Sequence, residues 1–468
     1  MLLSVLVPLF NEEEWVTEAL SRVLNAPLPP HIDLEIIVVD DASTDDSASL
    51  VEEFCGLYPS KVRLIRHEKN TGKGGAIQTA IAQARGDFCL FQDADLEYSP
   101  NDYTRMLQPL LNGTADCVYG SRFMTVGERR VLYFWHSVAN KLITGLCNMI
   151  SGLNLTDMET CYKATRTSLL QSIPLRSKRF GIEPELTIKL AQRQVAIVET
   201  PISYYGRTYD EGKKIGLKDA FQAVGVMLRY GLVRDIYREK GPEILDVLAN
   251  APHFNRWMAD TIRPYLGKRT MELGAGIGNL SLQLAKGARR YLATDIDAEH
   301  LSRLRNRLQH RRNFEVHRCN LECPTDFAPF QGAFDSVVCL NVLEHVENDL
   351  LGLSNIKSVL APGGRAVILV PQGMSVYGTL DEVLGHYRRY TADELRSRME
   401  QVGLRVDRIL EFNRITRPAW FVNGRILKKR TFSRFQIRVF DSLVWLWRPL
   451  DAIIPWAPTS LIAVGVRD

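Results

Sequence analysis

The sequence predicts an α/β protein with two doubly wound domains. Short apolar, β-branched runs alternate with helical patterns in both halves of the chain, and strands that are apolar throughout are typical of mostly parallel sheets covered on both faces. The chain has 468 residues, more than one hydrophobic core usually serves. The pattern breaks at 239–242 and then restarts, so we expect domains at 1–238 and 253–468, joined by a linker at 239–252.

Composition narrows the class of protein. Hydrophobic residues make up 46% and charged residues 24% of the chain, as in soluble globular proteins. The net charge of +4 is too small at this length to predict a nucleic-acid partner. The eight cysteines include no Cys-x-x-Cys pair, which indicates reduced thiols in a cytosolic protein. The first residues lack a basic region and no apolar run reaches about 18 residues. We therefore expect no signal peptide, no transmembrane helix and a cytoplasmic location.

Four apolar runs in the first half predict strands of one sheet, at Leu2–Val7, Leu34–Val39, Val62–Ile65 and Phe88–Phe91. Acidic residues follow two of these runs: Asp40 and Asp41 follow the second, and Asp93 and Asp95 follow the fourth. Ligands of parallel sheets bind at the carboxyl ends of the strands. Both acidic pairs are therefore expected at the same edge of the sheet.

The densest group of carboxylates follows Phe91. Asp93, Asp95 and Glu97 alternate along the chain, so in an extended segment their side chains point to one side. Oxygen ligands at this density suit Mg²⁺ or Mn²⁺ held against a phosphate, and a solvated acidic turn is the alternative. Together with the aspartates after the second strand, these residues favour a ligand with hydrogen-bond donors and a metal-bridged diphosphate. That description fits a nucleotide sugar.

Three motifs follow one another within residues 1–235: Val-Pro-Leu-Phe-Asn-Glu, Val-Val-Asp-Asp-Ala-Ser-Thr-Asp and Asp-Ala-Asp-Leu-Glu. They resemble family 2 glycosyltransferases of the GT-A fold, and among these the dolichyl- or polyprenyl-phosphate sugar synthases. The resemblance implies nucleotide contacts from Pro8, Phe10, Glu12, Asp40 and Asp41. It also implies that Asp93 and Asp95 act in catalysis and bind the metal together with Glu97. Phe10 and Glu97 stand where the family often has Tyr and Gln.

Basic residues further along are expected at phosphates. Arg122 follows a predicted strand and either reaches a phosphate or lies on the surface. The segment from Arg207 to Lys214, which includes Lys213, is similar to a loop that closes over the donor and acceptor phosphates in the enzymes named above; a solvated loop is the alternative. A lipid phosphate is already an anion and needs cations rather than a general base. The resemblance therefore implies catalytic roles for Arg122, Arg207 and Lys213.

Two helical patterns, at 129–152 and 215–238, carry apolar faces with basic or aromatic residues. They resemble helices that lie in a membrane interface, and buried helices packed on the sheet are the alternative. With a lipid acceptor, they lead us to expect a peripheral protein at the cytoplasmic face of a membrane.

The second half of the chain contains a separate predicted ligand-binding site. A predicted strand leads into Gly274, Gly276 and Gly278, and then into a helix. Glycines let the backbone approach a ligand, and a helix N-terminus favours negative charge. The next strand ends at Asp295, which is placed to accept from two ribose hydroxyls. A dinucleotide-binding Rossmann site is the rival interpretation, but Asn279 stands where that motif has its last glycine.

The motif Glu-Leu-Gly-x-Gly-x-Gly that begins at Glu272 resembles the first motif of class I S-adenosylmethionine-dependent methyltransferases. The order of further motifs over 250–411 agrees with this family. The resemblance implies that S-adenosylmethionine contacts Glu272, Gly274, Gly276, Gly278, Asp295, Asn320, Leu321 and Asn341.

His345 follows the fourth strand of the second half. It is either a general base for an acceptor hydroxyl or a structural histidine. Some small-molecule O-methyltransferases bind a metal at this place through Glu-x-x-Glu-His, but Asn341 replaces the first Glu here, so no second metal is expected. His386 to Tyr390 follows the fifth strand and either borders the acceptor pocket or forms a structural turn.

The last two strands are predicted as a hairpin at 404–410 and 460–466, interrupted by an insertion at about 412–458. The insertion carries a basic cluster, Lys428 to Arg430, followed by aromatic residues. This combination suits a membrane surface that holds a lipid-linked sugar. A substrate lid or a packing surface is the alternative.

The sequence thus predicts a bifunctional enzyme. Its first domain would transfer a sugar from a nucleotide sugar to a polyprenyl phosphate, with inversion and with Mg²⁺ or Mn²⁺. Its second domain would transfer a methyl group from S-adenosylmethionine to the glycolipid or its sugar. The alternatives are a transferase acting on a sugar hydroxyl in polysaccharide assembly and a non-catalytic S-adenosylmethionine-binding module. No motif indicates an oligomeric state.

Overall fold

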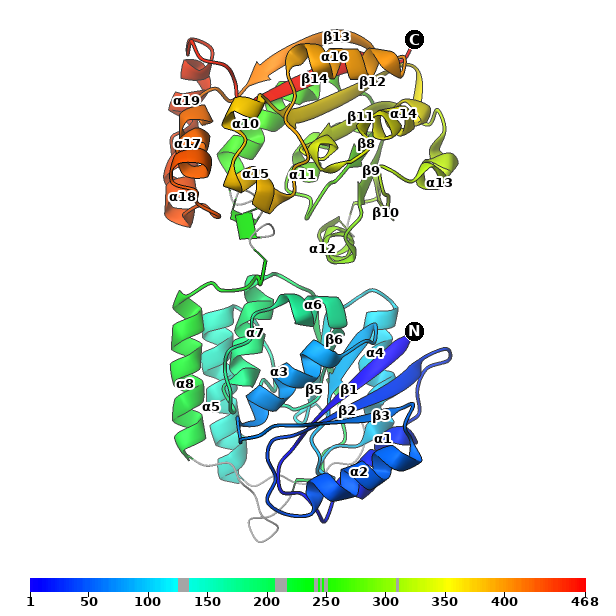
Figure 1. The fold of residues 1–468 in the computed structure, drawn as a ribbon, viewed down its shortest axis with the longest axis vertical. Coiled ribbons are helices and arrows are strands. Elements are labelled where there is room, and N and C mark those ends of the chain that lie inside the picture. The colour runs from blue at the N-terminus through cyan, green and yellow to red at the C-terminus, as the bar shows by residue number, and fades with distance from the viewer. Residues whose placement is uncertain (125–133, 207–216, 240–242, 245, 248–250, 309–310) are drawn as a thin grey trace. The chain divides into compact units, whose positions relative to one another are not determined.

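The computed structural model describes residues 1–124, 134–206, 217–239, 243–244, 246–247, 251–308 and 311–468. The chain divides into two compact units, Met1–Arg238 and Glu239–Asp468. Each is a mixed sheet with helices on both faces (Figure 1). The predicted fold class, α/β with two doubly wound domains, is confirmed.

The sheet of the first unit has the strand order β3-β2-β1-β4-β6-β5-β7 within the described residues. Its strands are β1 Leu2–Leu9, β2 Asp33–Asp40, β3 Val62–Arg66, β4 Phe88–Phe91, β5 Cys117–Ser121, β6 Lys163–Arg166 and β7 Ile197–Pro201. All neighbouring pairs are parallel except those of β6 with β4 and with β5. The order reverses at β1, which lies between β2 and β4. The carboxyl end of β1 is therefore the point at which a doubly wound sheet binds its ligand.

The helices of the first unit cover both faces of this sheet. They are α1 Val16–Leu24, α2 Ser47–Leu57, α3 Lys73–Gln83, α4 Tyr103–Leu111, α5 Phe134–Ser151, α6 Thr167–Ser172, α7 Ile182–Gln192 and α8 Leu217–Leu232. The central strands are buried on both sides; Ile36 and Val38 are fully inaccessible to solvent. Each such side chain contributes about 1.5–3 kcal/mol by leaving water, which explains why the strand sequences are apolar throughout.

The sheet of the second unit has the order β10-β9-β8-β11-β12-β14-β13, and β14 is antiparallel to both neighbours. Its strands are β8 Arg269–Leu273, β9 Arg290–Asp295, β10 Phe314–Arg318, β11 Phe334–Leu340, β12 Leu360–Pro371, β13 Arg405–Phe412 and β14 Ser460–Val466. The order reverses at β8, so the carboxyl ends of β8, β9 and β11 form its ligand-binding edge.

The helices of the second unit complete its two outer layers. They are α10 Pro252–Ile262, α11 Ser281–Leu284, α12 Ala298–Leu308, α13 Pro324–Phe327, α14 Asp349–Val359, α15 Thr379–Leu384, α16 Ala392–Gln401, α17 Arg417–Phe421, α18 Arg434–Ser442 and α19 Val444–Asp451. The last three form the insertion between β13 and β14 (Figure 1). No helix within the described parts of the chain combines the length and apolar character that crossing a bilayer requires.

Candidate active sites

Strand register brings the acidic residues of the first unit to one edge. Leu9 of β1 pairs with Asp40 of β2, and Leu6 of β1 pairs with Phe91 of β4. Asp41 and Asp93, which follow β2 and β4, therefore lie at the carboxyl ends on either side of β1. This is the arrangement that the sequence predicts.

Asp93 is held by a lysine from a different element. Lys73 Nζ, at the start of α3, lies 2.9 Å from Asp93 Oδ1 and 3.4 Å from Glu183 Oε1 at the start of α7. Burial opposes the charge of Lys73, but Asp93 and then Glu183 outweigh it and raise the pKa of the ammonium. The edge thus carries a permanent cation beside a carboxylate that is partly exposed.

Asp95 and Glu97 have other surroundings. Asp95 is buried, and its Oδ1 accepts from the backbone N–H of Glu97 at 3.1 Å. Glu97 Oε2 accepts from the hydroxyl of Tyr204 at 2.9 Å. The one group of three potential metal ligands found among the described residues lies in the second unit. The role of Glu97 as a third ligand stays a prediction, and the structure adds that its carboxylate also accepts from Tyr204.

The residues predicted at the nucleotide form a network around the loop before α3. Asp41 accepts from the Thr71 backbone at 2.8 Å, the Thr71 hydroxyl at 2.7 Å and the Gly72 backbone at 2.6 Å. His67 Nδ1 lies 2.8 Å from Asp41 Oδ1. Burial would raise the pKa of Asp41, but these hydrogen bonds outweigh it and lower the pKa. Asp41 therefore remains ionised and fixes the loop that presents Lys73.

The carboxyl end of β1 is more exposed to solvent than the network around Asp41. Phe10 is 39% exposed, and the backbone N–H groups of Asn11 and Glu12 donate to Ser43 and Ser47 at the start of the α2 region. Pro8 is the penultimate residue of β1. An exposed aromatic ring at the carboxyl end of β1 offers a stacking surface for a nucleotide base.

Arg122 does not lie on the surface. Its guanidinium makes two hydrogen bonds to the fully buried Asp157, from Nε at 2.7 Å and from Nη2 at 2.8 Å, and lies 5.2 Å from the centre of the Tyr204 ring. Burial lowers the pKa of Arg122, and Asp157 more than restores it. Asp157 thus orients a cation near the group of Glu97 and Tyr204. Arg207 and Lys213 lie outside the described residues.

In the second unit, the glycines follow β8 as predicted. Leu273 pairs with Thr294 on one side and with Cys339 on the other, so the loop begins between the ends of β9 and β11. Gly274, Gly276 and Gly278 have φ of 67°, 56° and 80°, values that L-residues adopt only with strain. A Cβ on Gly274 would lie 2.2 Å from Val342 Cγ2, whereas a Cβ on Gly276 would enter open space. The backbone at Gly276 is therefore free for close approach by a ligand.

Asp295 and Glu272 hold the glycine loop and the residues that follow it through hydrogen bonds. Asp295 Oδ2 accepts from the Gly276 N–H at 2.8 Å, and Oδ1 lies 3.2 Å from His300 Nδ1. Glu272 is buried, and its Oε2 accepts from the Ser281 hydroxyl at 2.5 Å and from the Tyr291 hydroxyl at 2.9 Å. Burial raises the pKa of Glu272 to about 7 against these two hydrogen bonds. Glu272 thus holds Ser281 and Tyr291, while Asp295 holds the backbone N–H of Gly276 in the loop.

Because Glu272 is buried, we expect the stability of the second unit to depend on pH. Its pKa is raised from 4.5 to about 7 on folding. A raised pKa stabilises the fold where the unfolded group is still protonated, and this stability is lost as the pH rises through the folded pKa. Between about pH 4.5 and pH 7 the second unit should lose up to about 3 kcal/mol from this group. In the Glu272→Gln variant, this contribution should be missing, so stability should fall less steeply with pH across this range than in the wild type, as measured by denaturation curves. An unchanged slope would contradict the assignment.

The remaining predicted contacts lie at the same edge. Asn320 and Leu321 follow β10, where Asn320 Oδ1 accepts from the Glu322 N–H at 3.0 Å and the Leu321 carbonyl accepts from Asn355 at 2.9 Å. Asn341 follows β11 with a φ of 53° and is exposed. His345, four residues later, has its pKa lowered to about 4 by burial and by the neighbouring His386. A pKa near 4 is poorly matched to a general base that works near neutral pH.

Comparison with known proteins decides the family of the first unit. Residues 4–173 match the model "Glycosyl transferase family 2". An undecaprenyl-phosphate mannosyltransferase of Micrococcus luteus is 31% identical over 48% of this chain and 93% of its own length. The chain belongs to glycosyl transferase family 2. A second relative of this glycosyltransferase is the UDP-N-acetylglucosamine–dolichyl-phosphate N-acetylglucosaminyltransferase of Methanococcus voltae, which is 27% identical over 50% of this chain and 98% of its own length.

This family 2 glycosyltransferase also carries a methyltransferase domain, because residues 271–366 match the model "Methyltransferase domain". A structure of an S-adenosylmethionine dependent methyltransferase from Mesorhizobium loti aligns over 47% of this chain and all of that chain, with 18% identity and a TM-score of 0.33. Several other relatives are covered by this chain over only about 60–63% of their own length. The prediction of an enzyme that joins these two families is confirmed.

The described residues fit the two expected ligands of this glycosyltransferase. Asp93 and Asp95 offer hard oxygen donors at the carboxyl end of β4, and Asp93 is already paired with a cation. Such a pair suits Mg²⁺ or Mn²⁺ that is shared with a diphosphate. The open space above Gly276 and the anchored Asp295 suit a nucleoside with two ribose hydroxyls.

Several residues at these sites are not found from sequence motifs. The sequence around Lys73 predicts a flexible turn, yet in the structure its ammonium forms an ion pair with Asp93. Asp157 has no motif of its own, yet it orients Arg122. Glu183, at the start of α7, lies 3.4 Å from Lys73 Nζ, a contact between segments that are far apart in the chain.

Proposed function

We propose that this enzyme transfers a sugar from a nucleotide sugar to a polyprenyl phosphate, with Mg²⁺ or Mn²⁺ at Asp93 and Asp95. The observation that carries the proposal is the set of paired charges at the carboxyl ends of β1 and β4. Two carboxylates can share a metal with the leaving diphosphate, while Lys73 and Arg122 supply positive charge for phosphates without needing a general base. The names of the relatives, which transfer sugars to undecaprenyl or dolichyl phosphate, support the same acceptor.

The described surface of the first unit supports a lipid acceptor. α5 and α8 lie side by side and pack on α7 (Figure 1). Their buried side chains, such as Cys147 and Met227, face the core. Their other faces expose large apolar side chains: Phe134, Trp135, Leu142, Met149, Phe221, Leu228 and Leu232. A contiguous apolar helix face with aromatic residues is typical of a membrane-interfacial surface.

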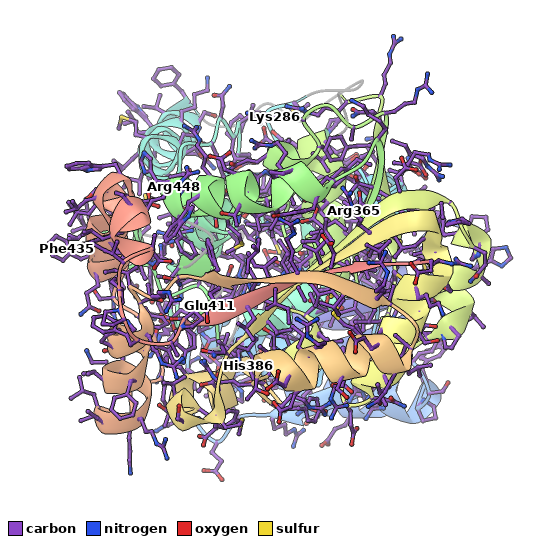
Figure 2. All side chains as sticks on the ribbon, turned by 90° about the horizontal axis from the view of Figure 1, so that it is seen from above. Lys286, Arg365, His386, Glu411, Phe435 and Arg448 are labelled. Carbon is purple, nitrogen blue, oxygen red and sulfur yellow. The ribbon has the colours of Figure 1, made fainter. Side chains whose placement is uncertain are left out.

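Like α5 and α8, the insertion of the second unit buries some of its apolar side chains and exposes others. Phe440 and Trp447 pack against the core, next to Phe254. Other apolar side chains of the insertion are exposed: Phe421, Val422, Ile426, Leu427, Phe435, Val439, Trp445, Ile453 and Trp456. Phe435 points away from the sheet (Figure 2). With Lys428, Lys429 and Arg430 nearby in sequence, this surface suits an anionic bilayer. We propose that it brings the methyltransferase domain to the same lipid.

A transfer assay tests the acceptor. The purified chain, Mn²⁺ and a panel of nucleotide sugars are combined with polyprenyl phosphate or with the corresponding alcohol, after a thermal-shift screen for the donor, since a ligand that binds the native state raises the melting temperature. The proposal expects glycolipid from the phosphate alone. Equal transfer to the alcohol, or transfer only to a free sugar, would favour the polysaccharide-assembly alternative.

The lipid surface gives a separate prediction. Replacing Trp135 and Met149 with Ala should weaken sedimentation of the chain with anionic vesicles by roughly tenfold or more, because about 25 cal/mol is lost for each Å² of apolar area that no longer enters the bilayer. Leu57→Ala is the matched control, since Leu57 is 73% exposed on α2 outside this surface. If the control weakens binding equally, the surface formed by α5 and α8 is not the one that meets lipid.

A further inference from the structure

Three potential metal ligands meet at the carboxyl end of β11. One atom each from Glu344, His345 and His386 lies within 4.8 Å of the others. Glu344 and His345 belong to the 3₁₀ turn Leu343–His345, and His386 lies between α15 and α16 (Figure 2). The backbone N–H of Tyr387 donates to the Glu344 carbonyl at 2.9 Å and joins the two segments.

Glu344 is unusual because it is a buried carboxylate. Its side chain is 0% exposed, and neither of its carboxylate oxygens has a hydrogen-bond partner among the residues that the structure describes. Leaving a buried polar group unpaired costs about 1–3 kcal/mol, and more for a charged one. A packing role would be filled better by an apolar side chain of similar size. A bound cation would supply the partner that this carboxylate lacks among the described residues.

The hydrogen bonds around His386 are those expected of a histidine that binds a metal. His386 Nδ1 lies 2.8 Å from Asp381 Oδ1, an arrangement that leaves a lone pair on Nε2. Asp381 is itself fixed by the Arg389 Nε at 2.8 Å, the Trp420 indole N–H at 3.2 Å and the Gly378 N–H at 3.1 Å. A carboxylate behind a histidine is the usual outer support of a metal ligand.

The rings of the two histidines also face each other. Their centroids are 4.7 Å apart at an interplanar angle of 78°, so the edge of one ring meets the face of the other. Both imidazoles can therefore present a nitrogen to one ion, because a ligand atom of each lies within 4.8 Å of the other and of the Glu344 carboxylate.

We propose that Glu344, His345 and His386 bind a divalent first-row transition metal, with Zn²⁺ as the type case. Two imidazoles and one carboxylate suit Zn²⁺, Co²⁺ or Fe²⁺ better than Mg²⁺. Three protein ligands leave a position open, as in catalytic zinc sites. The Asn at 341 argues against a metal only if the ligands must come from one short motif. Here the third ligand comes from the segment after β12.

The open coordination position of the metal gives it a role in the proposed methyl transfer. Glu344 follows Asn341 closely in the chain, at the edge where S-adenosylmethionine is expected. The metal would bind a hydroxyl oxygen of the methyl acceptor and hold it at this edge. This last role rests on the proposed function, whereas metal binding itself does not.

Titration with Co²⁺ tests the site, with its d–d absorption as the signal. The full chain should bind one Co²⁺ at this site. Its absorption should be lost, and its affinity should fall roughly a hundredfold or more, in both Glu344→Gln and His386→Gln. His317→Gln is the matched control, because His317 is exposed on β10. Co²⁺ held by the carboxylates of the first unit is common to all of these proteins and cancels in the difference spectrum.

The wild-type chain gives a second readout if a variant fails to fold. Zn²⁺ should shift the ring nitrogen signals of His345 and His386 in NMR spectra and leave those of His317 in place. Unchanged Co²⁺ spectra and affinities in both variants, or unshifted ring nitrogens, would overturn the proposal. Neither readout depends on methyl transfer, so failure of the metal site and failure of the proposed activity are distinguishable.

Discussion

Replacing Asp93 with Asn should lower glycosyl transfer about a thousandfold, which corresponds to a loss of ~4 kcal/mol in transition-state stabilisation. Asp93 is the partly exposed carboxylate at the end of β4, and Lys73 Nζ lies 2.9 Å from its Oδ1. The Asn side chain keeps the shape but removes the negative charge that balances Lys73 and that we propose holds the metal. Initial rates with donor and polyprenyl phosphate in excess measure the effect, and the variant should also lose the rise in melting temperature that Mn²⁺ produces.

Asp46→Asn is the matched control for this experiment. Asp46 is exposed and precedes α2, so it loses the same charge within the same unit. The control should keep transfer within about twofold of wild type, since surface substitutions away from such features change little. An Asp93→Asn variant that retains transfer within about tenfold would show that this carboxylate does not hold the leaving diphosphate.

Replacing Gly276 with Ala should weaken S-adenosylmethionine binding roughly a hundredfold, or by ~2.7 kcal/mol. The φ of Gly276 is 56° and its added Cβ meets no atom of the protein. The methyl group would instead occupy the space where the cofactor must approach the backbone. The fold should lose only the strain of one left-handed Ala, about 1–2 kcal/mol. Calorimetric titration gives the affinity, and urea denaturation gives the stability.

Gly287→Ala separates these two effects. Gly287 has a φ of 86°, also faces open space, and lies in the exposed turn before β9. It should lose similar stability and keep the affinity of wild type. Equal affinity losses in both variants would mean that strain in the sheet, rather than the space above Gly276, controls binding.

The parts of these sites that depend on short stretches of chain could be predicted from the sequence. Gly274 to Gly278 and Asp295 follow two apolar strands, and parallel pairing brings such strand ends together whatever the packing elsewhere. The same holds for Asp41 and Asp93 on either side of β1. Periodicity and strand ends carry this information directly.

Other parts depend on tertiary packing and could not be predicted. Lys73 reaches Asp93 only because α3 starts at the same sheet edge, and Glu97 turns to Tyr204 because a strand-like bridge joins Tyr98 and Tyr204. The case of Glu344 is sharper still. The proposal for Glu344 starts from a carboxylate that has no hydrogen-bond partner within the described part of the chain, and the lack of a partner has no signature in sequence. The motif around His345 also pointed away from a metal, because one ligand is distant in the chain.

We propose that one chain carries out two successive transfers on the same lipid. The most direct measurement combines the wild-type chain, polyprenyl phosphate in vesicles, Mn²⁺, the nucleotide sugar identified by thermal shift, and S-adenosylmethionine labelled in its methyl group. We expect label to enter the lipid fraction only when the nucleotide sugar is present. Asp93→Asn should prevent this labelling unless previously synthesised glycolipid is supplied. Labelled lipid in the absence of sugar transfer, or no labelled lipid with ready-made glycolipid, would contradict it.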